Sequence, residues 1–321
     1  MIKVQNHLID DPKNPLCEVI NDAAVIAALL ERGISLDPKH SNPDFHFVSA
    51  NITDPNDIPP RSICFERIDG AQIRFREHLK QPNCLRLVKM YYYGHYVTDL
   101  ECVDGRPHTR VINEGRFPMS KPSVELTRAE KDKVVLGPNF LHYKRHDLAV
   151  KKIQEFTEKG VEKDIDVFFA GTLQYGDSEH GSGILITEHR QTCVAALKDY
   201  KDKHPKKNVV IVEGRELGHT GYIKNLCRAK ITVSPWGWGE PCYRDYEANL
   251  ASCHVIKPYG YVIRTLCNPK PYYGVQPDWS DLDLAIRELS EVEHEGPDRL
   301  MAMRTPEWIA NNIAEIIGGI E

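Results

Sequence analysis

The stretch that decides the fold is Ile231–Pro258, ITVSPWGWGEPCYRDYEANLASCHVIKP. Its short apolar run Ile231–Val233 predicts a strand, and residues Pro235–Glu240 then interrupt regular structure. Helical spacing resumes over Tyr243–Leu250, and His254–Pro258 predicts the next strand. The order strand, loop, helix, strand is a βαβ unit and indicates an α/β protein with a parallel sheet.

The same unit carries residue types that suit a nucleoside diphosphate. In an open α/β sheet, ligands bind beyond the carboxyl ends of the strands, and a helix N-terminus there attracts an anion. Gly237 and Gly239 leave space for a ligand close to the main chain. Arg244 suits a diphosphate, and Glu247 lies three residues further along the same helix face, where a carboxylate suits the hydroxyls of a ribose.

This pattern resembles the donor-site signature of GT-B glycosyltransferases, especially their exostosin-like and group-1-like branches. The matching residues are Ser234-Pro235, Gly237, Gly239-Glu240, Arg244, Glu247-Ala248 and Val255-Ile256-Lys257-Pro258. The resemblance implies two Rossmann-like domains facing a cleft, with the nucleotide-sugar held by the C-terminal domain. The spacing of Glu240 and Glu247 is one residue shorter than in many retaining members, so stereochemistry and the role of Glu240 stay open.

The rest of the chain is consistent with two such domains, over residues 1–140 and 141–321. In the first, strands are predicted at Phe45–Ser49, Ser62–Phe65, Leu85–Tyr92 and Val134–Pro138, and helices at Ile20–Leu30 and Ala71–Lys80. In the second, strands are predicted at Ile165–Ala170, Val209–Val212 and Lys230–Val233, and helices at Leu148–Lys159, Thr187–His204, Thr220–Ala229, Asp281–Leu289 and Trp308–Ile317. The resemblance implies that the last of these helices crosses back onto the first domain. The polar segment Val97–Asp132 indicates either a loop-rich crossover or an insertion that shapes an acceptor site.

Composition narrows the class of protein. A formal charge of −5 argues against non-specific nucleic-acid binding as the main task. No apolar run approaches the length of a membrane span, and the first residues lack a signal-peptide pattern. The nine cysteines form no CxxC pair, which favours free thiols and a cytoplasmic protein over a disulfide framework or a zinc site.

Five further residues are candidates for the donor site. Gly171 and Thr172 follow a predicted strand and resemble the family loop that faces the donor phosphates. Arg190 is expected either to contact the diphosphate or to be an exposed arginine at a helix start. Tyr222 is expected either to stack on the nucleobase or to pack in the core. Lys224, on the same helix as Tyr222, is a further candidate for the leaving diphosphate.

An inverting transferase also needs a group that removes the acceptor's proton. Asp69 in FERIDGAQ is our first candidate, with Glu66 and His46 as alternatives, whereas a retaining enzyme needs no such base. Asp164 and Asp166 form a DxD, but they precede a strand instead of following one, so we interpret them as structural and not as a metal site.

Together these features predict a metal-independent glycosyltransferase without a further cofactor, moving a sugar from a UDP- or GDP-sugar to an acceptor hydroxyl. The diphosphate would be stabilised by Arg244 and backbone N–H groups, and the site would include Gly171, Thr172, Arg190, Tyr222, Gly237, Gly239, Glu240 and Glu247. Three alternatives stay open: a nucleotide-sugar-modifying enzyme such as an epimerase, a non-catalytic nucleotide- or glycan-binding relic, and another Rossmann-like protein with Arg244 and Glu247 as a surface ion pair.

Overall fold

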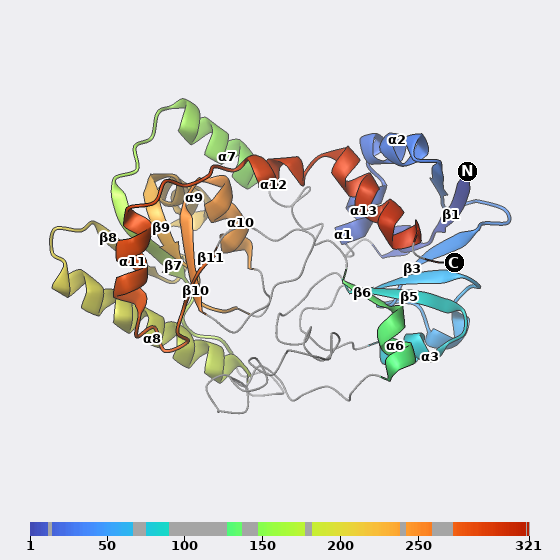
Figure 1. The fold of residues 1–321 in the computed structure, drawn as a ribbon, viewed down its shortest axis with the longest axis horizontal. Helices are drawn as coiled ribbons and strands as arrows, with labels where there is room; N and C mark the ends of the chain where they lie inside the picture. Colours follow the sequence, from blue (N-terminus) through green and yellow to red (C-terminus); the bar gives the residue numbers. More distant parts are fainter. Residues whose placement is uncertain are drawn as a thin grey trace.

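The computed structural model describes residues 1–11, 15–66, 75–89, 127–136, 147–176, 182–237, 242–258, 272–318 and 320. These residues form two sheets, each with helices on both faces (Figure 1). Every neighbouring pair of strands in both sheets runs parallel. The α/β class expected from the sequence is therefore confirmed.

The first sheet has six strands. In spatial order they are β2 (Ile34–Asp37), β1 (Ile2–Asn6), β3 (Phe45–Ser49), β4 (Ser62–Glu66), β5 (Cys84–Lys89) and β6 (Val134–Leu136). Successive side chains point to opposite faces, so Phe47 packs with one layer of helices and Val48 with the other. The first layer is α1 (Pro15–Ile20), α2 (Ala23–Glu31) and α13 (Pro306–Gly318); α3 (Arg76–Lys80) lies on the other face, next to α6 (Arg128–Lys133). Two short 3-10 helices, η1 (Leu8–Asp10) and η2 (Pro55–Asp57), complete the described part of this half.

Three differences from the sequence predictions concern short elements. The strands β1 and β2 were not predicted, because polar residues interrupt their apolar ones and neither has the continuous apolar run of a strand such as Val209–Val212. The predicted helix Ile20–Leu30 corresponds to α2, which begins three residues later, and the preceding helix α1 was not predicted. The carboxylate of Asp22 accepts a hydrogen bond from the backbone N–H of Ala24 at 2.9 Å, so α2 begins anew after α1 has ended.

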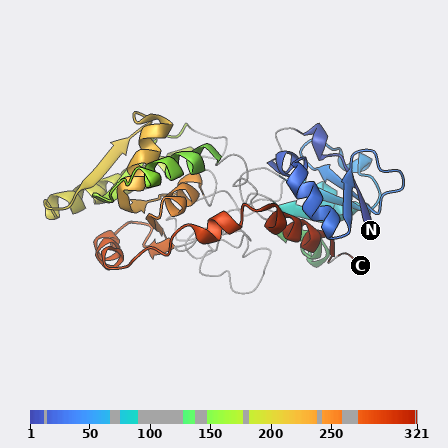
Figure 2. The ribbon, with the colours of Figure 1, turned by 90° about the horizontal axis from the view of Figure 1, so that it is seen from above.

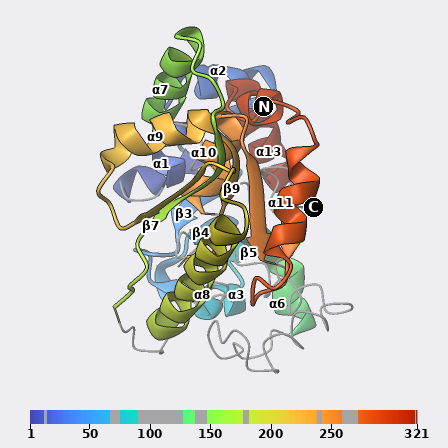
Figure 3. The ribbon, with the colours of Figure 1, turned by 90° about the vertical axis from the view of Figure 1, so that its left-hand side faces the viewer.

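The second sheet has five strands. Their spatial order is β11 (Tyr272–Val275), β10 (His254–Pro258), β9 (Ala229–Val233), β7 (Ile165–Gly171) and β8 (Val209–Glu213). The strand β11 at its edge was not predicted either. One face is covered by α8 (Ser182–Lys203) and α11 (Leu282–Ser290), and the other by α7 (Asp147–Glu158), α9 (Gly218–Arg228) and α10 (Tyr243–Leu250). Figure 3 shows α8 and α9 on opposite sides of this sheet.

The order of these strands creates a topological switch point between β7 and β9. The chain leaves β7 through α8 to reach β8, and then returns past β7 through α9 to reach β9. Because α8 and α10 cover opposite faces, the loops that follow β7 and β9 diverge. In open parallel sheets, this divergence leaves a crevice at the carboxyl ends of the strands.

The last helices belong to different halves of the molecule. Leu300 of α12 (Asp298–Ala302) packs in the core that contains α10, whereas Ile309 and Ile313 of α13 pack in the core of the first sheet. In Figure 2 these two helices follow one another from one half to the other. No helix among the described residues is long and apolar enough to span a lipid bilayer.

Candidate functional site

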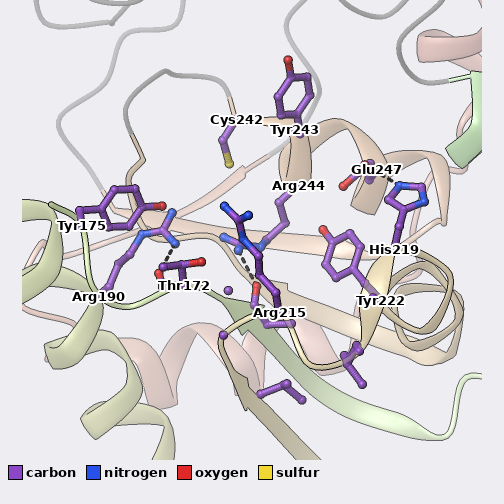
Figure 4. Close-up of a pocket in the computed structure, with 16 residues that line it drawn as sticks. Thr172, Tyr175, Arg190, Arg215, His219, Tyr222, Cys242, Tyr243, Arg244 and Glu247 are labelled. Atoms are coloured by element: carbon purple, nitrogen blue, oxygen red, sulfur yellow. Dashed lines mark hydrogen bonds and ion pairs between the residues drawn. The ribbon is translucent and has the colours of Figure 1, made fainter. Parts of the chain in front are cut away.

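A pocket of about 440 Å³ lies at the carboxyl edge of the second sheet, beside the switch point (Figure 4). It is lined by residues that follow β7 and β8 and by the first turns of α9 and α10. Two helix N-termini therefore meet in one cavity, and each contributes the positive end of its dipole. The cavity suits a negatively charged ligand.

A buried carboxylate fixes the N-terminus of α10. Asp245 accepts hydrogen bonds from the hydroxyl of Ser234 at 2.5 Å and from the backbone N–H of Cys242 at 2.9 Å. Its other close partner is Lys257 of β10, whose Nζ lies 2.9 Å from Oδ2, and both side chains are fully buried. Asp245 thus joins β9, β10 and α10. This role of Asp245 was not predicted, although a lysine inside an apolar strand indicates a buried counter-charge.

Arg244 is held beside the cavity in a buried position. It is 9% exposed, its Nη2 donates to the carbonyl oxygen of Ala170 at 2.6 Å, and its guanidinium lies 5.5 Å from the ring centre of Phe169. Its Nε and Nη1 atoms are buried without a hydrogen-bond partner among the described residues. Because a guanidinium stays charged in proteins, these two donors require a partner, and an anion in the pocket would supply one.

Arg190 is also buried, at 4% exposed, so the expectation of an exposed arginine is wrong. The helix α8 begins before the predicted Thr187, which places Arg190 inside it instead of at its start. Its Nε donates to the carbonyl oxygen of Trp236 at 2.8 Å and its Nη1 to that of Thr172 at 2.9 Å. The guanidinium lies over the ring of Tyr175 and lines the pocket.

Gly171 lies between these two arginines. A Cβ atom on Gly171 would come within 2.6 Å of Nη2 of Arg244 and 3.3 Å of Nη1 of Arg190. Any larger residue would therefore displace the guanidinium groups. Glycine at this position is required by the close approach of two charged side chains, not by an unusual backbone angle.

The loop after β9 is held by stacked aromatic rings. His189 is buried, with its ring 4.5 Å from that of Trp236 and 5.2 Å from that of Trp279. Burial, with the positive charges of Arg190 and Lys257, lowers the pKa of His189 to about 3. The imidazole is therefore neutral at physiological pH and serves as a flat packing group for the Trp236 loop.

Glu247 and Tyr222 form the far wall of the pocket. Glu247 is 8% exposed, and burial raises its pKa to about 7, although a hydrogen bond with the Tyr222 hydroxyl and the charge of Arg244 oppose that rise. The ring of Tyr222 lies 6.0 Å from that of Phe168 and also lines the cavity. Tyr222 therefore packs against the core and borders the site at the same time.

Two pocket residues, Arg215 and His219, were missed by the sequence analysis. Arg215 lies in the turn between β8 and α9, and His219 is the second residue of α9; Gly214 and Gly218, on either side of Arg215, have positive φ angles of 105° and 57°. The Nε2 atom of His219 lies 3.7 Å from Oε1 of Glu247. The two glycines that bracket a basic residue after a strand were the signal that pointed to a ligand loop.

The remaining predicted residues lie elsewhere. Lys224 is exposed on α9 and is not among the described residues that line the pocket, so its contact with a diphosphate stays a prediction. Gly237 is buried after β9, without lining the pocket. The predictions for Asp69, Gly239 and Glu240 fall outside the described residues.

The other candidates for a proton acceptor belong to the first sheet. Glu66 ends β4 and is fully buried. His46 of β3 pairs with His7, with 3.0 Å between Nδ1 of His46 and Nε2 of His7. Neither Glu66 nor His46 lines the pocket of the second sheet.

The DxD carboxylates lie at the opposite edge of the second sheet from the pocket. Asp164 precedes β7 and pairs with Arg228 at 2.6 Å, while Asp166 pairs with Lys230 at 3.0 Å. Asp166 also accepts a hydrogen bond from the backbone N–H of Asn208. These contacts join the beginnings of β7, β8 and β9, which is a structural role.

Comparison with known proteins gives little further information. No family model matches the chain, and no curated protein matches it in sequence. Among solved structures, the chain is similar to the crystal structure of AviGT4, a glycosyltransferase involved in Avilamycin A biosynthesis. The TM-score is 0.43 at 13% sequence identity, over 98% of this chain and 97% of that chain. At this level the likeness gives no information about the ligand.

Proposed function

We propose that the pocket binds a nucleotide-diphosphate sugar and that the protein is a glycosyltransferase. The observation that supports this most strongly is the buried guanidinium of Arg244, whose Nε and Nη1 have no hydrogen-bond partner among the described residues. It lies at the carboxyl edge of a parallel sheet, next to the N-termini of α9 and α10. Those features suit a diphosphate, and Glu247 beyond them suits the ribose.

In the proposed reaction, the bond between the anomeric carbon and the diphosphate oxygen breaks, and a bond to the acceptor oxygen forms. Negative charge then accumulates on the departing diphosphate. Arg244 and Arg190 are already fixed beside the cavity by the carbonyl oxygens of Ala170, Thr172 and Trp236. Positioned charges that need no rearrangement lower the barrier most effectively, and we propose that they act here without a metal ion.

The acceptor's proton is a separate question. If the enzyme inverts, we propose Asp69 as the base that removes it. The donor half of the reaction does not depend on this assignment, so the two parts can be tested independently.

The first test is thermal unfolding with UDP, GDP, ADP and CMP, without added metal. A ligand that binds only the folded protein raises the unfolding temperature. We expect one nucleoside diphosphate to stabilise the wild type and to stabilise Glu247→Gln much less. Glu158→Gln, an exposed site on α7, is the matched control and should behave as the wild type does. If no nucleotide stabilises any of these proteins, with or without Mg²⁺, the donor site is wrong.

The second test identifies the reaction. The stabilising nucleotide defines which nucleotide-sugars to incubate with the protein, first without an acceptor. We expect slow release of free sugar and nucleoside diphosphate, because water replaces the acceptor. An isomeric nucleotide-sugar would instead indicate an epimerase, and binding without any turnover would indicate a non-catalytic relic.

A further inference from the structure

Three arginines are among the described residues that line the pocket, and only two of them have a place in the proposed donor site. Arg190 and Arg244 are buried and fixed by carbonyl oxygens. Arg215 is exposed, lines the same pocket, and forms no hydrogen bond or ion pair from its guanidinium within the described part of the chain. In Figure 4 its side chain extends into the pocket on the side where Arg244 lies. Its role is unexplained by packing.

Three guanidinium groups around one cavity repel each other unless negative charge lies between them. Among the described residues that line the pocket, the one carboxylate is Glu247, whose pKa of about 7 leaves it only partly ionised at neutral pH. The carbonyl oxygens that hold Arg190 and Arg244 provide partial charges alone. The pocket therefore has more positive charge than one phosphate group neutralises at neutral pH.

Arg215 lies in a turn that leads directly into α9. Gly214 and Gly218 bracket it with positive φ angles, and the N–H of Gly218 donates to the carbonyl oxygen of Arg215. The helix α9 begins after this turn without a side-chain cap, and its first residues line the same pocket as Arg215, so the N–H groups of its first turn are available to an anion there.

We infer that Arg215 and the N-terminus of α9 bind a second anionic group of the ligand, next to the one that Arg244 and Arg190 bind. The site then selects a ligand with two linked phosphates over a ligand with one. The inference rests on the proposed function, because it identifies Arg215 as the residue that distinguishes a nucleoside diphosphate from the monophosphate of the same base.

The experiment compares two affinities in three proteins: wild type, Arg215→Ala and Arg287→Ala. Arg287 is exposed on α11 and does not line the pocket, so its replacement removes the same charge from the same domain. Calorimetry would measure binding of the nucleoside diphosphate and of the monophosphate with the same base. We expect Arg215→Ala to weaken binding of the diphosphate by about tenfold, because one charge-assisted hydrogen bond is lost. Binding of the monophosphate should weaken by less than about twofold. Arg287→Ala should change neither.

Two results would overturn the inference while leaving the donor site intact. Equal weakening of both nucleotides would show that Arg215 acts only as a general positive charge, and no weakening would show that it does not touch the ligand. Inorganic pyrophosphate and inorganic phosphate, used as probes, distinguish a failure of the proposed function from a failure of this inference. If no nucleotide binds, but pyrophosphate stabilises the wild type more than phosphate does and Arg215→Ala loses that difference, the two-anion site is correct and the nucleotide is wrong.

Discussion

At the scale of single residues, the pocket depends on buried charge. Arg244 and Glu247 are one helical turn apart, and both are more than nine-tenths buried. The two residues are therefore not an ion pair on the solvent-exposed surface. Their environments differ: Arg244 remains charged, whereas burial shifts Glu247 towards its neutral form.

Gly171→Ala should weaken ligand binding strongly with a small effect on folding. The new Cβ would lie 2.6 Å from Nη2 of Arg244, so the guanidinium has to leave the carbonyl oxygen of Ala170. We expect at least about a tenfold loss of nucleotide affinity, the loss of one charge-assisted contact. Gly176→Ala is the control, because its Cβ would meet no atom within 4 Å. Equal affinities in the two variants would contradict this arrangement.

Glu247→Gln should change stability in a pH-dependent manner. The pKa of this carboxyl is about 7 in the folded protein and 4.5 in the unfolded chain, so ionisation opposes folding. Below pH 4.5 the carboxyl is protonated in both the folded and the unfolded protein, so its ionisation does not affect stability. Between pH 4.5 and pH 7 the wild type loses about 3 kcal/mol of unfolding free energy, because only the unfolded chain ionises freely. Thermal unfolding at pH 5 and pH 8 should show that the unfolding temperature of the variant, relative to that of the wild type, is higher at pH 8. A difference that is constant with pH would disprove the raised pKa.

At the scale of elements, α10 is positioned by residues that do not line the pocket. Asp245 connects its first turn to Ser234 after β9 and to Lys257 in β10. Ser234, Asp245 and Lys257, from three parts of the stretch Ile231–Pro258, thus form one structural unit. A carboxylate and an ammonium buried together stabilise the fold only while both remain, because either one alone is an unpaired charge in an apolar environment.

Lys257→Met should therefore destabilise the protein severely. It leaves the fully buried Asp245 without its counter-charge, and we expect a loss of about 3–5 kcal/mol in urea denaturation. The double variant Lys257→Met/Asp245→Asn should recover much of that loss, since no unpaired charge remains. If the double variant is no more stable than the single one, the ion pair is not the cause.

At the scale of the whole molecule, the C-terminal segment connects the two halves. The helix α13 packs on α2, and Arg32 donates through Nε to Oδ1 of Asn311 at 2.6 Å. Leu300, a few residues earlier, is packed in the core beside α10. The first sheet's core is therefore incomplete without residues from the end of the chain.

Ile313→Ala tests this contribution. Ile313 is 1% exposed in the core of the first sheet, so its truncation should cost about 2–5 kcal/mol of unfolding free energy. Hydrogen exchange should report the loss in β1 and β3, with little change in β9 and β10. Leu284→Ala, on an exposed apolar side chain of α11, should change stability by less than about 0.5 kcal/mol. Equal effects of the two substitutions would show that α13 does not complete this core.

The elements predicted well from sequence are those with long or strongly apolar patterns. The strand Ile165–Ala170 and the helix Tyr243–Leu250 appear with boundaries within a residue. The short strands β1, β2 and β11 were missed because polar residues or a glycine interrupt their apolar residues, unlike the continuous run of Val209–Val212. The predicted helix Ile20–Leu30 begins before the cap at Asp22, which starts α2, and the preceding helix α1 was missed.

What the sequence by itself determined is part of the pocket's chemistry: an arginine and a glutamate three apart, after a glycine-bearing loop, in a βαβ unit. Periodicity and residue type are local properties, so one stretch of chain sufficed. Only the tertiary structure decided which residues from elsewhere join them. Arg190 and Arg215 reach the pocket because β7 and β8 end beside it, and Lys224 does not because it lies on the exposed side of α9. Which strands are neighbours, and which side of a helix is covered, follow from packing between distant segments, and no local pattern contains that information.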